Sequence, residues 1–131
     1  MRVTADTNVL VRAVMEDHPE QSRAAQLALG RAEMVALTMP TLCELAWVLR
    51  SYKIRPADIA STIRDLLNAA NVVVNRPATE AGLAQLDAGG DFADGVIAYE
   101  GSWLGADTFL SFDKAATKLI EARGHAVRLL S

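Results

Sequence analysis

Hydrophobic and polar positions along the chain form two kinds of segment, which alternate with each other. Apolar runs rich in β-branched residues, about five residues long, predict strands, and the longer segments between them carry apolar residues at helical spacing. The predicted strands are residues 2–6, 34–38, 71–75, 108–112 and 126–130. The predicted helices are residues 9–15, 20–32, 40–52, 55–70, 77–86, 91–101 and 113–123. Thr7 and Asn8 are expected to cap the first helix.

Strands that alternate with helices of this length predict parallel pairing with helical crossovers. We therefore expect an α/β fold, a three-layer α/β/α sandwich with a central parallel sheet of four to five strands. Residues 1–131 are expected to form a single domain with one core. Trp47 and Trp103 are predicted to lie in that core.

Composition narrows the class of protein. Hydrophobic residues make up 51% of the chain, but no apolar run is long enough to span a bilayer, and Met1 leads into the first strand without a signal-peptide pattern. The single cysteine, Cys43, excludes an internal disulfide, which favours a cytoplasmic protein. The net charge of −3 argues against a general nucleic-acid coat protein, but not against an enzyme that acts on nucleic acid with bound cations.

Four carboxylates stand at the ends of predicted elements, each among apolar neighbours: Asp6, Glu44, Asp94 and Asp113. Ligands of parallel sheets bind at the carboxyl ends of the strands, and all four residues are placed toward that edge. Hard cations require clustered oxygen ligands, so these residues predict a cation site. Asp6 and Asp113 alone would be read as turn or cap residues, but Glu44 has no capping role.

Other residues carry weaker predictions. Asp91 is expected to cap the helix that contains Asp94, or to bind a second metal ion. Thr7 and Ser111 could hydrogen-bond a metal-bound water or a phosphate, and Arg12 and Lys114 could contact RNA phosphates. His18 and His125 are isolated from each other and from Cys43, so no zinc site is predicted.

The four motifs resemble those of the PIN domain, and in particular the VapC toxins of bacterial toxin–antitoxin pairs. They are Asp6-Thr7-Asn8-Val9-Leu10, Glu44-Leu45-Ala46-Trp47-Val48-Leu49, Asp91-Phe92-Ala93-Asp94-Gly95-Val96-Ile97-Ala98 and Phe109-Leu110-Ser111-Phe112-Asp113-Lys114. The resemblance covers the whole chain in the right order. It departs at Ser111, where Thr is common, and at Gly95, where Ala is more usual and where glycine would loosen the start of the helix.

The resemblance implies an endoribonuclease that uses Mg²⁺ or Mn²⁺ held by Asp6, Glu44, Asp94 and Asp113, with Thr7, Asn8 and Ser111 in support. It also implies a homodimer that is inhibited by a VapB-type antitoxin. A haloacid-dehalogenase-type phosphatase would need a second Asp at position 8, where this chain has Asn, and a receiver domain would need an Asp at position 75, where it also has Asn. The alternative from another class is a catalytically silent PIN-like domain that binds RNA or a partner protein.

Overall fold

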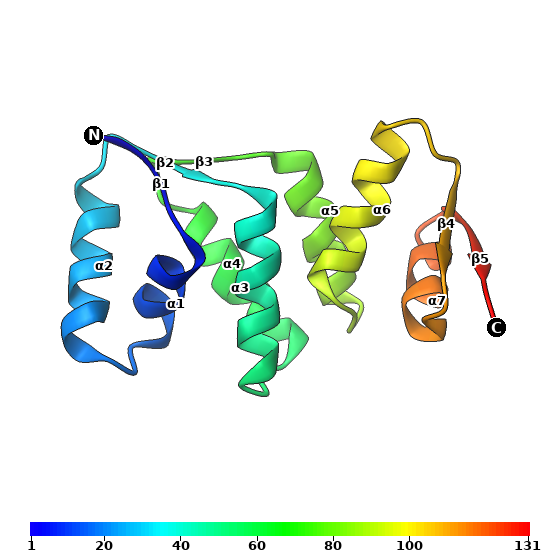
Figure 1. Cartoon of the computed structure of the whole chain (residues 1–131), viewed down its shortest axis with the longest axis horizontal. Helices are drawn as coiled ribbons and strands as arrows, with labels where there is room; N and C mark the ends of the chain where they lie inside the picture. The colour runs from blue at the N-terminus through cyan, green and yellow to red at the C-terminus, as the bar shows by residue number, and fades with distance from the viewer. The chain divides into compact units, whose positions relative to one another are not determined.

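The computed structural model describes residues 1–131, which form two compact units. The N-terminal unit comprises Met1–Asn75 and the C-terminal unit comprises Arg76–Ser131. Figure 1 traces the chain from its blue N-terminus to its red C-terminus. None of the helices has the length and apolar character needed to cross a membrane.

The N-terminal unit has three strands and four helices, in the order β1(Arg2–Thr4), α1(Thr7–Met15), α2(Pro19–Arg31), β2(Met34–Leu37), α3(Met39–Ser51), α4(Pro56–Leu67) and β3(Val72–Val74). The strands pair in parallel in the order β1-β2-β3. The strands lie at one end of the unit, and the helices extend away from them (Figure 1).

Helix starts in this unit have local causes. Pro19, Pro40 and Pro56 each lie in a first turn, where the missing N–H has no helical partner to lose. The apolar faces of the helices pack into a core that includes Leu10, Leu42, Leu45, Leu49, Ile59 and Ile63, all of them fully buried.

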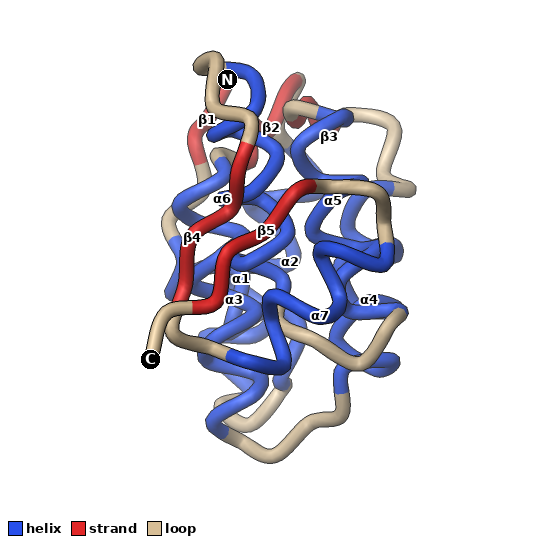
Figure 2. Tube along the Cα trace, turned by 90° about the vertical axis from the view of Figure 1, so that its right-hand side faces the viewer, coloured by secondary structure: helices blue, strands red, loops and turns tan.

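The C-terminal unit has the order α5(Arg76–Asp87), α6(Phe92–Trp103), β4(Thr108–Ser111), α7(Lys114–Ala122) and β5(Ala126–Leu129). β4 and β5 pair in parallel, from Thr108 opposite Ala126 to Ser111 opposite Leu129. Figure 2 shows these two strands side by side in red, with α7 next to them.

Two glycines set the close packing of α5 on α6. A Cβ atom at Gly82 would lie 2.5 Å from the ring of Phe92, which is fully buried. A Cβ atom at Gly95 would overlap the backbone carbonyl oxygen of Ala81. The missing side chain at Gly95 is what allows the two helices to approach, and the expected loosening of the helix start stays a prediction.

The α/β class with parallel strands is confirmed, and every predicted helix and strand is present within a few residues of its predicted ends. The five strands are divided between a three-stranded and a two-stranded sheet, whereas a single sheet of four to five strands was predicted. The pattern of apolar residues along a chain indicates where strands lie, but pairing depends on contacts that are distant in sequence.

The prediction that both tryptophans are core residues is wrong. Trp47 is 67% exposed and Trp103 is 80% exposed. Trp47 lies on the outer face of α3, while its neighbours Leu45 and Ala46 are buried. Trp103 is the last residue of α6, beyond the part of the helix that packs in the core.

Candidate functional site

Asp6 lies between the end of β1 and the start of α1, and it caps that helix. Its Oδ1 accepts a hydrogen bond of 2.7 Å from the backbone N–H of Thr7. The predicted caps, Thr7 and Asn8, are instead the first two residues of the helix. Asp6 is exposed, and its Oδ2 has no hydrogen-bond partner within the protein, so one carboxylate oxygen remains available to a ligand.

Glu44 lies in the second turn of α3, the helix that follows β2. Leu42 and Leu45 on either side of it are fully buried, whereas Glu44 itself is exposed and makes no hydrogen bond or ion pair. Because β1 and β2 are parallel neighbours, the two elements that follow them begin at the same end of the sheet. The N-terminal unit therefore contributes Asp6 and Glu44 at the carboxyl end of its strands.

Asp94 is half-buried in the first turn of α6. Asp91 occupies the N-cap position of the same helix with an extended backbone, but its side chain makes no capping hydrogen bond. The expectation that Asp91 caps the helix is correct for its position and wrong for its side chain, because the carboxylate does not accept the first-turn N–H groups. Its carboxylate remains available, and its role with a second metal ion stays a prediction.

Asp113 follows β4 and caps α7. Its Oδ1 accepts a hydrogen bond of 2.9 Å from the N–H of Ala116. The Oγ of Ser111 accepts a hydrogen bond of 2.9 Å from the N–H of Asp113 and so fixes the turn between the strand and the helix. Asp113 is exposed and its Oδ2 is free, and the adjacent Lys114 is exposed without an ion pair.

The two acids of the C-terminal unit lie toward the same end of it. Figure 1 shows α6 and β4, which contact each other, running in opposite directions. The first turn of α6, with Asp94, is therefore at the end of the unit where β4 finishes and Asp113 begins α7. Within neither unit do three acidic, histidine or cysteine side chains form a group that would hold a metal ion.

The predicted four-ligand site takes two carboxylates from each unit, so its assembly stays a prediction. The residues themselves fit a hard divalent cation. All four offer carboxylate oxygens, the donors that Mg²⁺ and Mn²⁺ prefer. The hydroxyl of Thr7, next to Asp6, is buried without a hydrogen-bond partner and so leaves an unmet polar group beside this candidate ligand.

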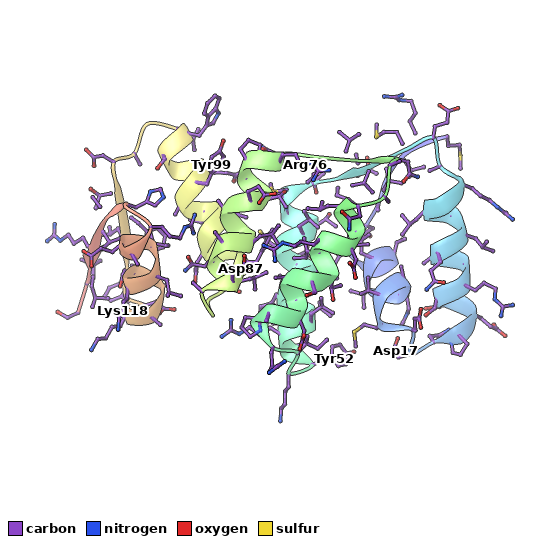
Figure 3. The ribbon with its side chains drawn as sticks, turned by 180° about the vertical axis from the view of Figure 1, so that it is seen from behind. Asp17, Tyr52, Arg76, Asp87, Tyr99 and Lys118 are labelled. Atoms are coloured by element: carbon purple, nitrogen blue, oxygen red, sulfur yellow. The ribbon has the colours of Figure 1, made fainter.

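Arg12 has an intramolecular role that the sequence did not suggest. Its Nε donates to Gln21 Oε1 at 2.6 Å, and its guanidinium pairs with Asp17 at 3.2 Å. Asp17 lies in the loop between α1 and α2 (Figure 3). Arg12 thus joins these two helices, and Asn8 is exposed near it on the same groove. The contact of Arg12 with RNA phosphates and the supporting role of Asn8 at the metal site stay predictions.

Phe112 is a residue near the site that sequence reasoning passed over. It is 73% exposed and directly precedes Asp113. The signal that would have found it is its place in the connection between the strand that ends at Ser111 and the candidate ligand Asp113, because such connections lie on the surface.

Comparison with curated proteins gives no match. Comparison with family models gives a match to the PIN domain over residues 3–120, a range that includes both units and all four candidate carboxylates. PIN domains are generally nucleases, typically dependent on divalent metal ions. The extent of the match shows that the chain belongs to the PIN domain family.

Proposed function

We propose that the protein is a metal-dependent endoribonuclease that acts as the toxin of a toxin–antitoxin pair in the cytoplasm. The family match carries the nuclease part of this proposal, because all four predicted carboxylates lie within it. The toxin part rests on the resemblance of the four motifs to VapC proteins.

The local structure supports a metal-binding role for these acids. Asp6 and Asp113 each use one carboxylate oxygen for a helix cap and keep the other free. The capping bond fixes the orientation of the side chain, so the free oxygen is held in place before any ligand arrives. Bound Mg²⁺ or Mn²⁺ would activate a water molecule and neutralise charge on the phosphodiester.

Exposed apolar surface supports a protein partner. A groove of about 550 Å³ lies between α1 and α2, lined by Val9 and by the small residues Ala24, Ala25 and Ala28. Leu27 on α2 is 46% exposed. A homodimer or a VapB-type antitoxin would cover such surface, as the resemblance implies.

The alternative is a catalytically silent PIN domain that binds RNA or a protein. The exposed aromatic and apolar residues of both units, such as Trp47 and Phe112, would serve this alternative as well. The free carboxylate oxygens of Asp6 and Asp113 favour the nuclease.

Cleavage of labelled cellular RNA by the purified protein separates the two proposals. The nuclease should cut RNA in Mg²⁺ or Mn²⁺, lose this activity in EDTA and regain it when metal is restored. Sequencing the ends of the fragments would identify the preferred site. A protein that binds RNA without cutting it in either metal would be the silent domain.

A further inference from the structure

The two-stranded sheet of the C-terminal unit has a cationic residue on its exposed face, and an exposed aromatic residue follows the end of β4. Side chains alternate along β4, so that Phe109 and Ser111 are half-buried while Thr108 and Leu110 are exposed. Leu110 is paired in register with exposed Arg128 of β5, and partners in register share a face. Leu110 and Arg128 therefore share this exposed face, and Phe112 lies in the bend that follows β4, one residue beyond its last paired residue, Ser111.

Phe112 is held outward by the hydrogen bonds of its neighbours. The carbonyl of Ser111 accepts a bond of 2.8 Å from the N–H of Leu130, and the hydroxyl of Ser111 accepts one of 2.9 Å from the N–H of Asp113. Asp113 is fixed in turn by its capping bond to Ala116. With the residues on both sides fixed, Phe112 remains 73% exposed, which leaves most of its apolar surface in water at a cost in free energy.

Exposed cations without ion pairs lie close to Phe112 along the chain and on the paired strand β5. Lys114 follows Asp113, and Lys118 lies one turn further along α7, where i,i+4 spacing puts both on one helical face. Figure 3 shows Lys118 projecting from α7. Neither lysine nor Arg128 takes part in an ion pair, and all three are exposed. An exposed ring among unpaired cations is the arrangement that binds single-stranded nucleic acid, through base stacking and phosphate contacts.

We propose that Phe112 stacks on a base of single-stranded RNA and so places the adjoining phosphate beside Asp113. Lys114 and Arg128 contact the flanking phosphates. This inference rests on the proposed ribonuclease function and adds to it a residue that positions the substrate. Only an unstacked base presents its face to a phenyl ring, so the ring would engage unpaired RNA and not duplex.

Trp103 provides a matched control. It is an aromatic residue with 80% exposure in the same unit, but it ends α6, at the opposite end of that helix from Asp94. Its removal should have no effect on RNA bound near Asp113.

The test measures how tightly the full-length protein binds a fluorescently labelled oligoadenylate, with a duplex of the same length as competitor. All proteins in the test carry Asp94→Asn to prevent cleavage. Phe112→Ala and Phe112→Leu should each bind about tenfold more weakly, whereas Phe112→Tyr and Trp103→Ala should bind like the parent. Phe112→Leu keeps most of the apolar volume, so its loss of binding would not reflect misfolding. The indole fluorescence of Phe112→Trp, in a background with Trp47 and Trp103 replaced by Phe, should be quenched by the oligonucleotide.

Equal binding by Phe112→Leu and the parent would overturn the stacking role while leaving the nuclease proposal intact. A loss of binding in Trp103→Ala as large as that in Phe112→Leu would overturn the stacking role too. A change of oligomeric state in Phe112→Leu with unchanged RNA binding would also overturn it, because the ring would then contact another protein chain. An unmodified protein that neither cleaves nor binds any RNA would overturn the proposed function itself.

Discussion

Gly95 in α6 lies directly against the backbone carbonyl of Ala81 in α5, so that any side chain at position 95 would overlap the carbonyl oxygen. The same carbonyl accepts a hydrogen bond of 3.2 Å from the guanidinium of Arg123, at the end of α7. Three helices of the C-terminal unit are therefore fixed around one peptide group. Asp94 precedes Gly95 by one residue, which makes its position depend on this contact.

Gly95→Ala should destabilise the protein, even though alanine is the better helix former. The overlap with Ala81 forces α5 and α6 apart, and such overpacking typically costs about 1–3 kcal/mol, more than the roughly 1 kcal/mol that helix propensity contributes. Gly101→Ala in the same helix is the control, because nothing lies within 4 Å of the added methyl group. It should stabilise by about 0.5–1 kcal/mol. Urea denaturation followed by circular dichroism measures the free energy of unfolding of both variants. Equal changes in the two variants would contradict a tight contact between Gly95 and Ala81.

Replacing Asp6 should separate its capping role from its proposed metal role. Asparagine retains the oxygen that accepts from the N–H of Thr7, and alanine does not. Asp6→Asn should therefore unfold at the same free energy as the unmodified apo protein or a higher one, while Asp6→Ala should lose about 1 kcal/mol. Both variants should lose RNA cleavage. A destabilised Asp6→Asn would show that the charge itself is structural.

Divalent metal should stabilise the unmodified protein against heat. A ligand that binds only the native state adds about 2.7 kcal/mol when its concentration is a hundred times its Kd. Mg²⁺ or Mn²⁺ should therefore raise the Tm, with a smaller rise in Asp94→Asn and Asp113→Asn. Ca²⁺ and K⁺ at matched ionic strength serve as controls for specificity and screening. If the metal raised the Tm of Asp94→Asn and Asp113→Asn as much as that of the unmodified protein, these acids would be excluded as ligands.

Arg123→Ala should weaken the core of the C-terminal unit. Gln85 is fully buried, and its Oε1 accepts a hydrogen bond of 3.2 Å from Arg123. Removing the donor leaves the buried Oε1 of Gln85 without it, and an unmet buried polar group costs about 1–3 kcal/mol. Arg128→Ala, on an exposed strand position, should change stability by less than about 0.5 kcal/mol. Thermal unfolding of both variants measures this difference in stability.

The proposed assembly makes a prediction for solution. The protein alone should be a dimer at micromolar concentration by light scattering, and an antitoxin bound at saturation should suppress cleavage. An arginine of that antitoxin would suit the acids, because its guanidinium pairs with carboxylates in bidentate fashion and competes with the metal. A monomer in solution would contradict the dimer, and undiminished cleavage in the complex would contradict the inhibition.

Local signals in the sequence were sufficient to predict where the helices and strands lie. They were insufficient to predict which residues become buried when these elements pack together. Pro40, Pro56 and the cap at Asp113 act over a few residues, so the helix starts that they set were predictable. The cap at Asp6 was not predicted, because Thr7 and Asn8 next to it are also capable caps. The exposure of Trp47 and the need for glycine at position 95 depend on which elements pack together. The four acids could be named because motif spacing is local, whereas their convergence depends on contacts between residues far apart in the chain.

The capping bonds of Asp6 and Asp113 have a consequence for how this protein can change by mutation. Asp and Asn codons differ by a single base, and asparagine preserves the cap while removing the charge. Activity can thus be lost at these two codons without loss of the fold. In a selection for cells that survive expression of the protein, mutants that still accumulate and still bind the antitoxin should be concentrated there. Frameshifts and core substitutions would instead remove the protein altogether.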